Sequence, residues 1–261
     1  MLSFACFFPH PPIIIPGVGK ENLKLVKKTI NAAKKLNQEI LKIKPDISLI
    51  VSPHGLILPE AFVLNLSPKY QGNFEAFGDF TTKLEFKGNP DFAYYIRREL
   101  SKTFPISIVT QKELDHGCLV PLYYLTNQLE NFSLLPISYS FLDYKTHFEF
   151  GKALKELIFS SNKKIAFIAS GDLSHRLTFD APAGYSPSGR IFDEHLIKYL
   201  RKKAIKQIVG FDYSLTEEAG ECGLRSLLIL LGLLDEVNYQ PEILSYEGPF
   251  GVGYLVVNFK L

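Results

Sequence analysis

IAFIASGDLSHRL, residues 165–177, is the stretch of sequence that decides the fold. Its first six residues, 165–170, are almost all apolar and predict a short β-strand that is buried on both faces. Gly171 then lets the backbone turn, and Asp172 and His175 follow just beyond the strand. The stretch therefore places side chains capable of acid–base or metal chemistry at the carboxyl end of a buried strand.

The same arrangement occurs twice more, earlier in the chain. ISLIVS (47–52) is followed by His54, and FACFF (4–8) is followed by His10, both in proline-containing turns. In open α/β sheets, ligands bind at the carboxyl edge of the strands. We therefore expect the three histidines to converge on one metal site.

The order of the elements predicts an α/β protein. Strand 2–8, a helix over 21–43 with apolar residues every three or four positions, and strand 47–52 form a β-α-β unit, which predicts parallel pairing with a right-handed crossover. Segments 67–81 and 176–188 are rich in turn-forming residues, and we expect both to be loops beside the site. Further strands are predicted over 60–66, 82–86, 106–110, 133–139, 242–246 and 252–259, and further helices over 91–103, 121–129, 145–160, 189–203 and 217–234.

Composition excludes several classes of function. The chain has 261 residues and a net charge of +2, so it lacks the strongly basic surface that nucleic-acid binding requires. The apolar run LRSLLILLGLL (224–234) is shorter than the roughly 18 residues of a membrane span and predicts a buried core helix. The sequence shows no signal-peptide pattern, and its 3 cysteines are widely spaced, so we expect a cytoplasmic protein. No linker or repeat divides the chain, and we expect a single domain over 1–261.

Two imidazoles and one carboxylate can hold a divalent iron and leave coordination positions open for substrate and dioxygen. The candidates for these ligands are His10, His54 and Glu221, of which Glu221 lies in AGECG (219–223) at the start of an apolar helix. The alternative for Glu221 is a helix-terminal carboxylate stabilised by the helix dipole. The neighbouring Cys222 is either a soft metal ligand or a plain buried thiol.

His175 and His116 remain as candidate acid–base groups, because an imidazole titrates near neutrality and can take up and return a proton. Asp172 and Asp115 precede them and could orient them, although a helix cap for Asp172 and a turn role for Asp115 are the alternatives. The two remaining histidines, His147 and His195, lie on predicted amphipathic helices, and we assign them structural roles.

These residues lie in stretches that resemble a known family, the B-subunit (LigB-type) fold of the class III extradiol ring-cleavage dioxygenases. The chain is most similar to the LigB-like domain of the AmmeMemoRadiSam group, which includes the Memo proteins. The resemblance extends over nearly the whole chain. The matching stretches are FPHPPIIIPGVG (8–19), SPHG (52–55), LDHGCLVPLYYL (114–125), ASGDLSHRLTFDAPAGYSPSG (169–189), EEAGECGLRSLLILLG (217–232) and SYEGPFGVGY (245–254).

The resemblance implies a three-layer α/β/α architecture around a mixed, mostly parallel sheet. It implies that His10 and His54 bind the metal together with an acidic residue from 217–222. Ring-cleaving members use a glutamate there and Memo proteins a cysteine, and we expect Glu221, with Cys222 as the alternative. It also implies that His175 is the acid–base residue and that His116 lies near the substrate.

The expected function is that of a non-haem Fe(II)-dependent oxidoreductase, an extradiol-type dioxygenase acting on a catechol-type or other small aromatic substrate with O2. The alternative is a metal-binding accessory or redox protein that works with a radical-SAM or AMMECR-type partner without ring cleavage. Zinc is the alternative metal, because imidazole and carboxylate ligands suit it too. We expect no nucleic acid or membrane as a partner, and the fold is compatible with a homodimer.

Overall fold

The computed structural model describes residues 1–261 and contains one eight-stranded sheet in the order β6-β3-β7-β2-β8-β1-β10-β9. The three strands that precede the quoted histidines lie together in its centre, where β8 pairs in parallel with both β1 and β2. Only the pairs β3/β7, β1/β10 and β10/β9 are antiparallel. The strands are β1 (Leu2–Phe8), β2 (Ile47–Ser52), β3 (Phe62–Asn65), β6 (Ile106–Val109), β7 (Ser133–Ser138), β8 (Ile165–Ser170), β9 (Gln240–Glu247) and β10 (Tyr254–Lys260).

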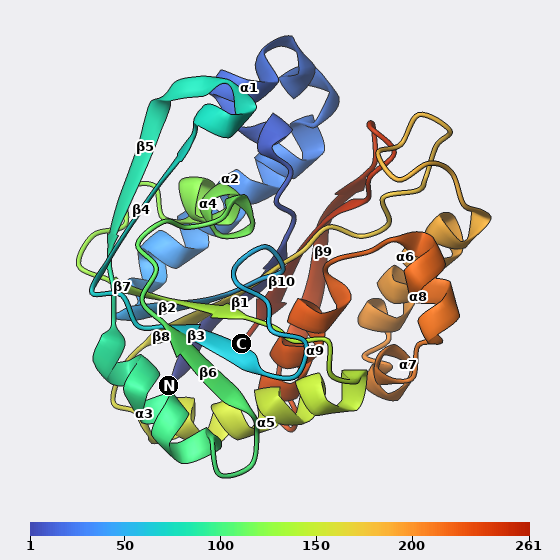
Figure 1. Ribbon diagram of the computed structural model, residues 1–261. Coiled ribbons are helices and arrows are strands. Elements are labelled where there is room, and N and C mark those ends of the chain that lie inside the picture. The colour runs from blue at the N-terminus through green and yellow to red at the C-terminus, as the bar shows by residue number, and fades with distance from the viewer.

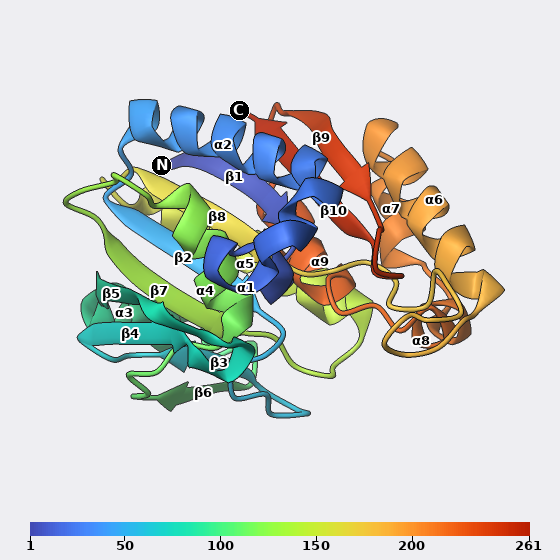
Figure 2. The same cartoon turned by 90° about the horizontal axis from the view of Figure 1, so that it is seen from above.

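Helices cover both faces of this sheet, which confirms the predicted three-layer α/β/α fold (Figures 1 and 2). Successive residues of β8 point to opposite faces, so Phe167 belongs to the core beneath α5 and α9 and Ile168 to the core beneath α2 and α4. The helices are α1 (Pro16–Gly19), α2 (Lys27–Ile43), α3 (Pro90–Leu100), α4 (His116–Leu125), α5 (Tyr144–Ser160), α6 (Pro187–Arg201), α7 (Ile205–Val209), α8 (Tyr213–Ala219) and α9 (Leu224–Leu233).

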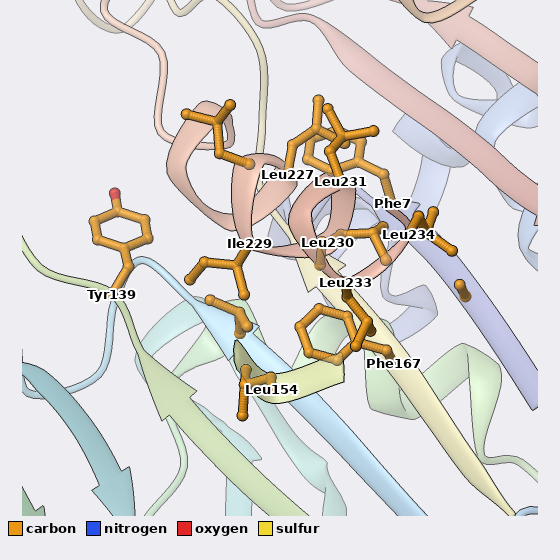
Figure 3. Packing of buried hydrophobic residues seen from close by; sticks show 14 of the residues in the cluster. Phe7, Tyr139, Leu154, Phe167, Leu227, Ile229, Leu230, Leu231, Leu233 and Leu234 are labelled. Carbon is orange, nitrogen blue, oxygen red and sulfur yellow. The ribbon is translucent and has the colours of Figure 1, made fainter. Parts of the chain in front are cut away.

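Helix α9 is the most apolar helix of the core, and its leucines surround Phe7 and Phe167 of the sheet (Figure 3). It packs closely against α5, because a Cβ at Gly151 would lie 2.0 Å from the carbonyl oxygen of Ile229. Its burial explains the apolar run of 224–234 as a core helix, as predicted. No helix is long and apolar enough to cross a membrane.

Four predicted elements differ from the structure. The helix predicted over 21–43 begins only at Lys27, and a 3-10 helix over Lys20–Leu25 precedes it. Segment 67–81 is not a loop: it contains β4 (Lys69–Phe74) and the start of β5 (Asp79–Lys87), which form a separate two-stranded sheet beside α4. Helix α4 begins at His116 rather than at 121, because the Asp115 side chain caps it by accepting a hydrogen bond from the Cys118 amide.

The predicted helix over 217–234 is two helices, α8 and α9, separated by residues 220–223. Gly220, with φ of 64°, ends α8 in the left-handed conformation that glycine adopts without strain. The irregular segment between the two helices holds Glu221 and Cys222, so its exact path decides which of these side chains faces the site.

Candidate metal centre

The ends of β1 and β2 and the segment before α9 bring His10, His54 and Cys222 together. Their ligand atoms all lie within 4.8 Å of one another. The Nε2 atoms of His10 and His54 are 3.0 Å apart, and the Cys222 sulfur lies 3.5 Å from the Nε2 of His10. The predicted convergence of the first two histidines at one edge of the sheet is therefore present in the structure.

The His10 ring is fully enclosed and is held in one tautomer by Ser170, the last residue of β8. Its Nδ1 lies 2.9 Å from the Ser170 Oγ, which in turn donates to the carbonyl oxygen of Gly117 at 2.5 Å. A hydroxyl has one proton to give. Because Ser170 gives it to Gly117, the serine oxygen must accept from His10 Nδ1–H, which leaves Nε2 unprotonated and facing His54 and Cys222.

Pro121 explains why the Gly117 carbonyl oxygen can accept a hydrogen bond from Ser170. It lies inside α4 and has no N–H, so the carbonyl oxygen four residues earlier, that of Gly117, has no partner in the helix ladder. Ser170 fills that vacancy from the neighbouring strand. A proline expected at the first turn of a helix thus lies one turn further in and frees an acceptor at the site.

Cys222, rather than the expected Glu221, lies beside His10 and His54 as the candidate third ligand. This placement corrects our expectation that Glu221 is the third ligand and Cys222 the alternative. The Glu221 carboxylate accepts a hydrogen bond from the Leu224 amide at 2.6 Å and lines a separate cavity with Tyr144 and Arg225. It is the helix-terminal glutamate of the alternative interpretation. Because adjacent side chains point in different directions here, Glu221 and Cys222 cannot both face the histidines.

Cys222 is brought to the site by the close approach of two glycines. A Cβ at Gly171 would lie 2.1 Å from the Cα of Gly223, so any larger residue would push the segment before α9 away from the end of β8. In this position the Asp172 amide donates to the Cys222 sulfur at 3.3 Å, and the Cys222 amide donates to the Asp172 carbonyl oxygen. Burial raises the pKa of the Cys222 thiol well above its ordinary value. A bound cation would act in the opposite direction and favour the thiolate.

His116 and His175 complete the site around a cavity of about 330 Å³. The His116 ring stacks on that of His54, with 4.2 Å between centroids, and the His175 side chain lines the cavity with its Nδ1 unpartnered. Segment 176–188 contributes Pro182 to the lining, and Phe77 in the turn of the β4–β5 hairpin contacts His116. Both segments expected beside the site therefore reach it.

The four histidines of the site are neutral at physiological pH. Burial, and then the neighbouring imidazoles, lower the pKa of His10 well below its ordinary value. Desolvation and the nearby His116 lower the pKa of His54 to about 4, and desolvation also lowers the pKa of His116 and of His175. Neutral imidazole is the form that binds metals and accepts protons.

Two aspartates organise the loops that carry these rings. Asp172 accepts a hydrogen bond from the His10 amide at 2.9 Å, and burial raises the pKa of its carboxyl group to about 7. Asp115 accepts from the Ser52 hydroxyl at 2.5 Å while capping α4, which sets the position of His116. Sequence reasoning missed Ser52 and Ser170, whose only signal is that each is the polar last residue of an apolar strand.

The other two histidines do not line this cavity. His147 is buried within the core, and its Nδ1 and Nε2 lie 2.8 Å and 3.1 Å from the carbonyl oxygens of Asp143 and Ser140. His195 lies on α6, where its ring is near that of Tyr199. Their placement agrees with the structural roles predicted for them.

Comparison with known proteins gives three kinds of similarity. Residues 4–257 match the family model described as the catalytic LigB subunit of aromatic ring-opening dioxygenase. The chain is 34% identical over 266 residues to protein CA_C1420 of Clostridium acetobutylicum, with 97% of this chain aligned, and spans 56% of the length of that protein. It is 24% identical to a 3,4-dihydroxyphenylacetate 2,3-dioxygenase of Escherichia coli, over 94% of each chain.

A MEMO1 family protein of Methanococcoides burtonii is 28% identical over 162 residues, which are 57% of this chain and 61% of that protein. Among solved structures, an uncharacterized Escherichia coli K12 protein, JW3007, superposes with a TM-score of 0.70 at 18% identity over 98% of both chains, which supports the fold. With a family model that spans residues 4–257, this chain belongs to the LigB family of aromatic ring-opening dioxygenase subunits, with Memo-like relatives.

Proposed function

We propose that this protein is a non-haem Fe(II)-dependent oxidoreductase that opens the ring of a catechol-type substrate with O2. The observation that carries the proposal is the convergence of His10, His54 and Cys222 beside the cavity that His116 and His175 line. Membership of the LigB family and similarity to a named ring-cleaving dioxygenase support the same class of reaction.

The donor atoms fit a divalent transition metal. Ser170 leaves the His10 Nε2 lone pair free, and the Cys222 sulfur receives a backbone N–H, as a metal thiolate would. An iron bound by these three ligands would supply the redox chemistry that brings a diol and dioxygen to reaction. Two imidazoles and a thiolate also suit zinc, and metal analysis after anaerobic purification without added metal separates iron from zinc.

The chain's own groups account for the handling of protons. His175 is neutral and lines the cavity, so its imidazole can accept the proton of a substrate hydroxyl and return it to the product. His116, stacked on His54, presents a second neutral ring to the same cavity. Apolar residues such as Phe250 and Val252 line the rest and provide a dry surface for an aromatic ring.

The test is aerobic turnover of a panel of diphenols by the Fe(II)-loaded protein. The expected product has the mass of the substrate plus two oxygen atoms, both derived from isotopically labelled dioxygen. Absence of such a product from every diphenol, in protein that holds stoichiometric iron, would overturn the proposal.

The thiolate donor favours a second candidate function. With Cys222 rather than Glu221 beside the histidines, the site departs from the carboxylate set that we expected for ring cleavage. The second candidate is a metal-binding accessory or redox protein that acts with a radical-SAM or AMMECR-type partner. Stoichiometric metal, no ring opening and co-purification with such a partner from cells would support it over the first.

A further inference from the structure

A second cavity adjoins the site, and His54 is the one residue that lines both. This cavity has a volume of about 570 Å³, larger than the 330 Å³ cavity in which His116 and His175 lie. It is formed by the ends of β2 and β7, by β3 and by segment 109–115. A single aromatic ring beside the metal ligands leaves this second space free for whatever the ring carries.

The wall nearest to His54 presents unused hydrogen-bond acceptors. Ser138 is only 8% exposed, and its hydroxyl makes no hydrogen bond within the protein although it lines the cavity. Asp115 uses its Oδ1 for Ser52 and for the cap of α4, and its Oδ2 remains free. Both free oxygens surround the point where a side chain of Gly55 would begin, the Ser138 Oγ at 2.4 Å and the Asp115 Oδ2 at 3.4 Å.

Positive charge is scarce around this space. The smaller cavity is lined by no lysine or arginine. The larger one is lined by a single cation, Lys112, which is exposed and accompanied by the carboxylates of Glu113 and Asp115. A substrate carboxylate would thus face the Asp115 carboxylate next to His54 and could accept only from the Ser138 O–H, whereas an ammonium group would donate to both oxygens.

We propose that the substrate carries a protonated amine on a short arm, which extends past His54 and binds Asp115 and Ser138. This inference rests on the proposed function and names its substrate class, an aminoalkyl diphenol in place of a carboxyalkyl one. The ring lies by the metal ligands, and the ammonium group satisfies the free Asp115 Oδ2 and the Ser138 hydroxyl. Charge-assisted hydrogen bonds of this kind are about twice as strong as neutral ones.

Three ligands with the same ring and a two-carbon arm test the proposal: 2-(3,4-dihydroxyphenyl)ethylamine, 3-(3,4-dihydroxyphenyl)propionate and 4-ethylcatechol. Their dissociation constants are measured anaerobically by calorimetry on Zn²⁺-loaded protein, so that binding is observed without turnover. We expect the amine to bind about tenfold more tightly than 4-ethylcatechol, and the acid more weakly than either. Equal affinity for all three ligands would overturn the inference and leave the proposed function standing, whereas no binding of any of them would overturn both.

Two variants locate the arm. Gly55→Ala places a methyl group between the Ser138 and Asp115 oxygens, and Ser138→Ala removes one partner, so both should reduce the ratio of amine to 4-ethylcatechol affinity several-fold. Metal content and thermal unfolding are measured on each variant, to show whether the substitution has disturbed metal binding or folding. An unchanged ratio in both folded, metal-loaded variants would overturn the proposal. The proposal would also be overturned if the acid bound most tightly of the three ligands and lost that affinity in Lys112→Ala, because the substrate arm would then be anionic.

Discussion

Replacing Ser170 with alanine should weaken metal binding without removing a ligand. In the native chain, the Ser170 Oγ accepts the Nδ1–H of His10 and donates to the Gly117 carbonyl oxygen. A metal on Nε2 requires the proton to remain on Nδ1. In the variant that N–H has no partner in the metal-bound state, whereas the metal-free ring can move its proton to Nε2 and avoid the loss.

The size of the effect follows from the burial of His10, which is 1% exposed, so water cannot replace the serine. A buried donor without a partner costs about 1–3 kcal/mol, and each 1.4 kcal/mol is tenfold in affinity, so the dissociation constant should rise by about 5- to 140-fold. In the variant the Gly117 carbonyl oxygen loses its donor with and without metal, and this loss therefore lowers stability rather than affinity.

The assay is a competition titration of Zn²⁺ against a chromogenic chelator, with circular dichroism and thermal unfolding to establish that the variant folds. Ser48→Ala is the matched control, because Ser48 is a fully buried serine of the adjacent strand β2 whose hydroxyl has no hydrogen-bond partner. Native affinity in Ser170→Ala, or an equal loss in Ser48→Ala, would refute the tautomer argument.

Three further outcomes follow from the site. Cys222→Ala should lose stoichiometric metal while Glu221→Gln retains it, as measured by metal analysis of folded protein; loss in Glu221→Gln alone would restore the carboxylate as a ligand. His175→Ala should keep its metal and lower kcat/KM for ring opening by about 10²–10⁴-fold, which steady-state kinetics checks, and undiminished turnover would remove its acid–base role. Burial raises the pKa of Asp193 from its ordinary value of 3.8 to about 7, so the stability that its neutral form contributes is present below pH 4 and lost as the pH rises through 7. The unfolding free energy of the native chain should therefore fall relative to that of Asp193→Asn over this range, by up to about 4 kcal/mol, and parallel pH profiles of the two proteins would contradict this.

The sequence predicts the central strands well because they are buried on both faces. A short, mostly apolar run such as ISLIVS or IAFIAS is typical of a strand buried on both faces, and the carboxyl ends of parallel strands meet at one edge of the sheet. That geometry brought His10 and His54 together in the prediction as it does in the structure. The strand pattern is therefore sufficient to locate the site, although not to complete it.

The third ligand was not predictable from pattern, because Glu221 and Cys222 are neighbours and only the path of the backbone separates them. The path depends on the left-handed Gly220, on the contact of Gly223 with Gly171 and on the capping of α9 by Glu221 itself. These are tertiary effects that leave no periodic signal in the sequence.

Strand β4 was missed for a different reason, whereas the strand predicted over 82–86 lies within β5. The residues of β4 that face α4 include Gly72, and the Leu119 side chain packs into the space that a larger residue at position 72 would fill. The alternation of large apolar residues is therefore interrupted where the contact is closest. The apolar content of the strand is too low to predict a strand from sequence, and its burial comes from a helix that is distant in the chain.

The position of β1 in the sheet has a consequence for how the protein is made. β1 is synthesised before the other strands of the sheet, yet both of its neighbours, β8 and β10, come from the second half of the residues described here. During translation, β1 and the following His10 have no strand to pair with until more than half of the residues described here have been synthesised. The three candidate metal ligands can therefore come together only after Cys222 has been translated.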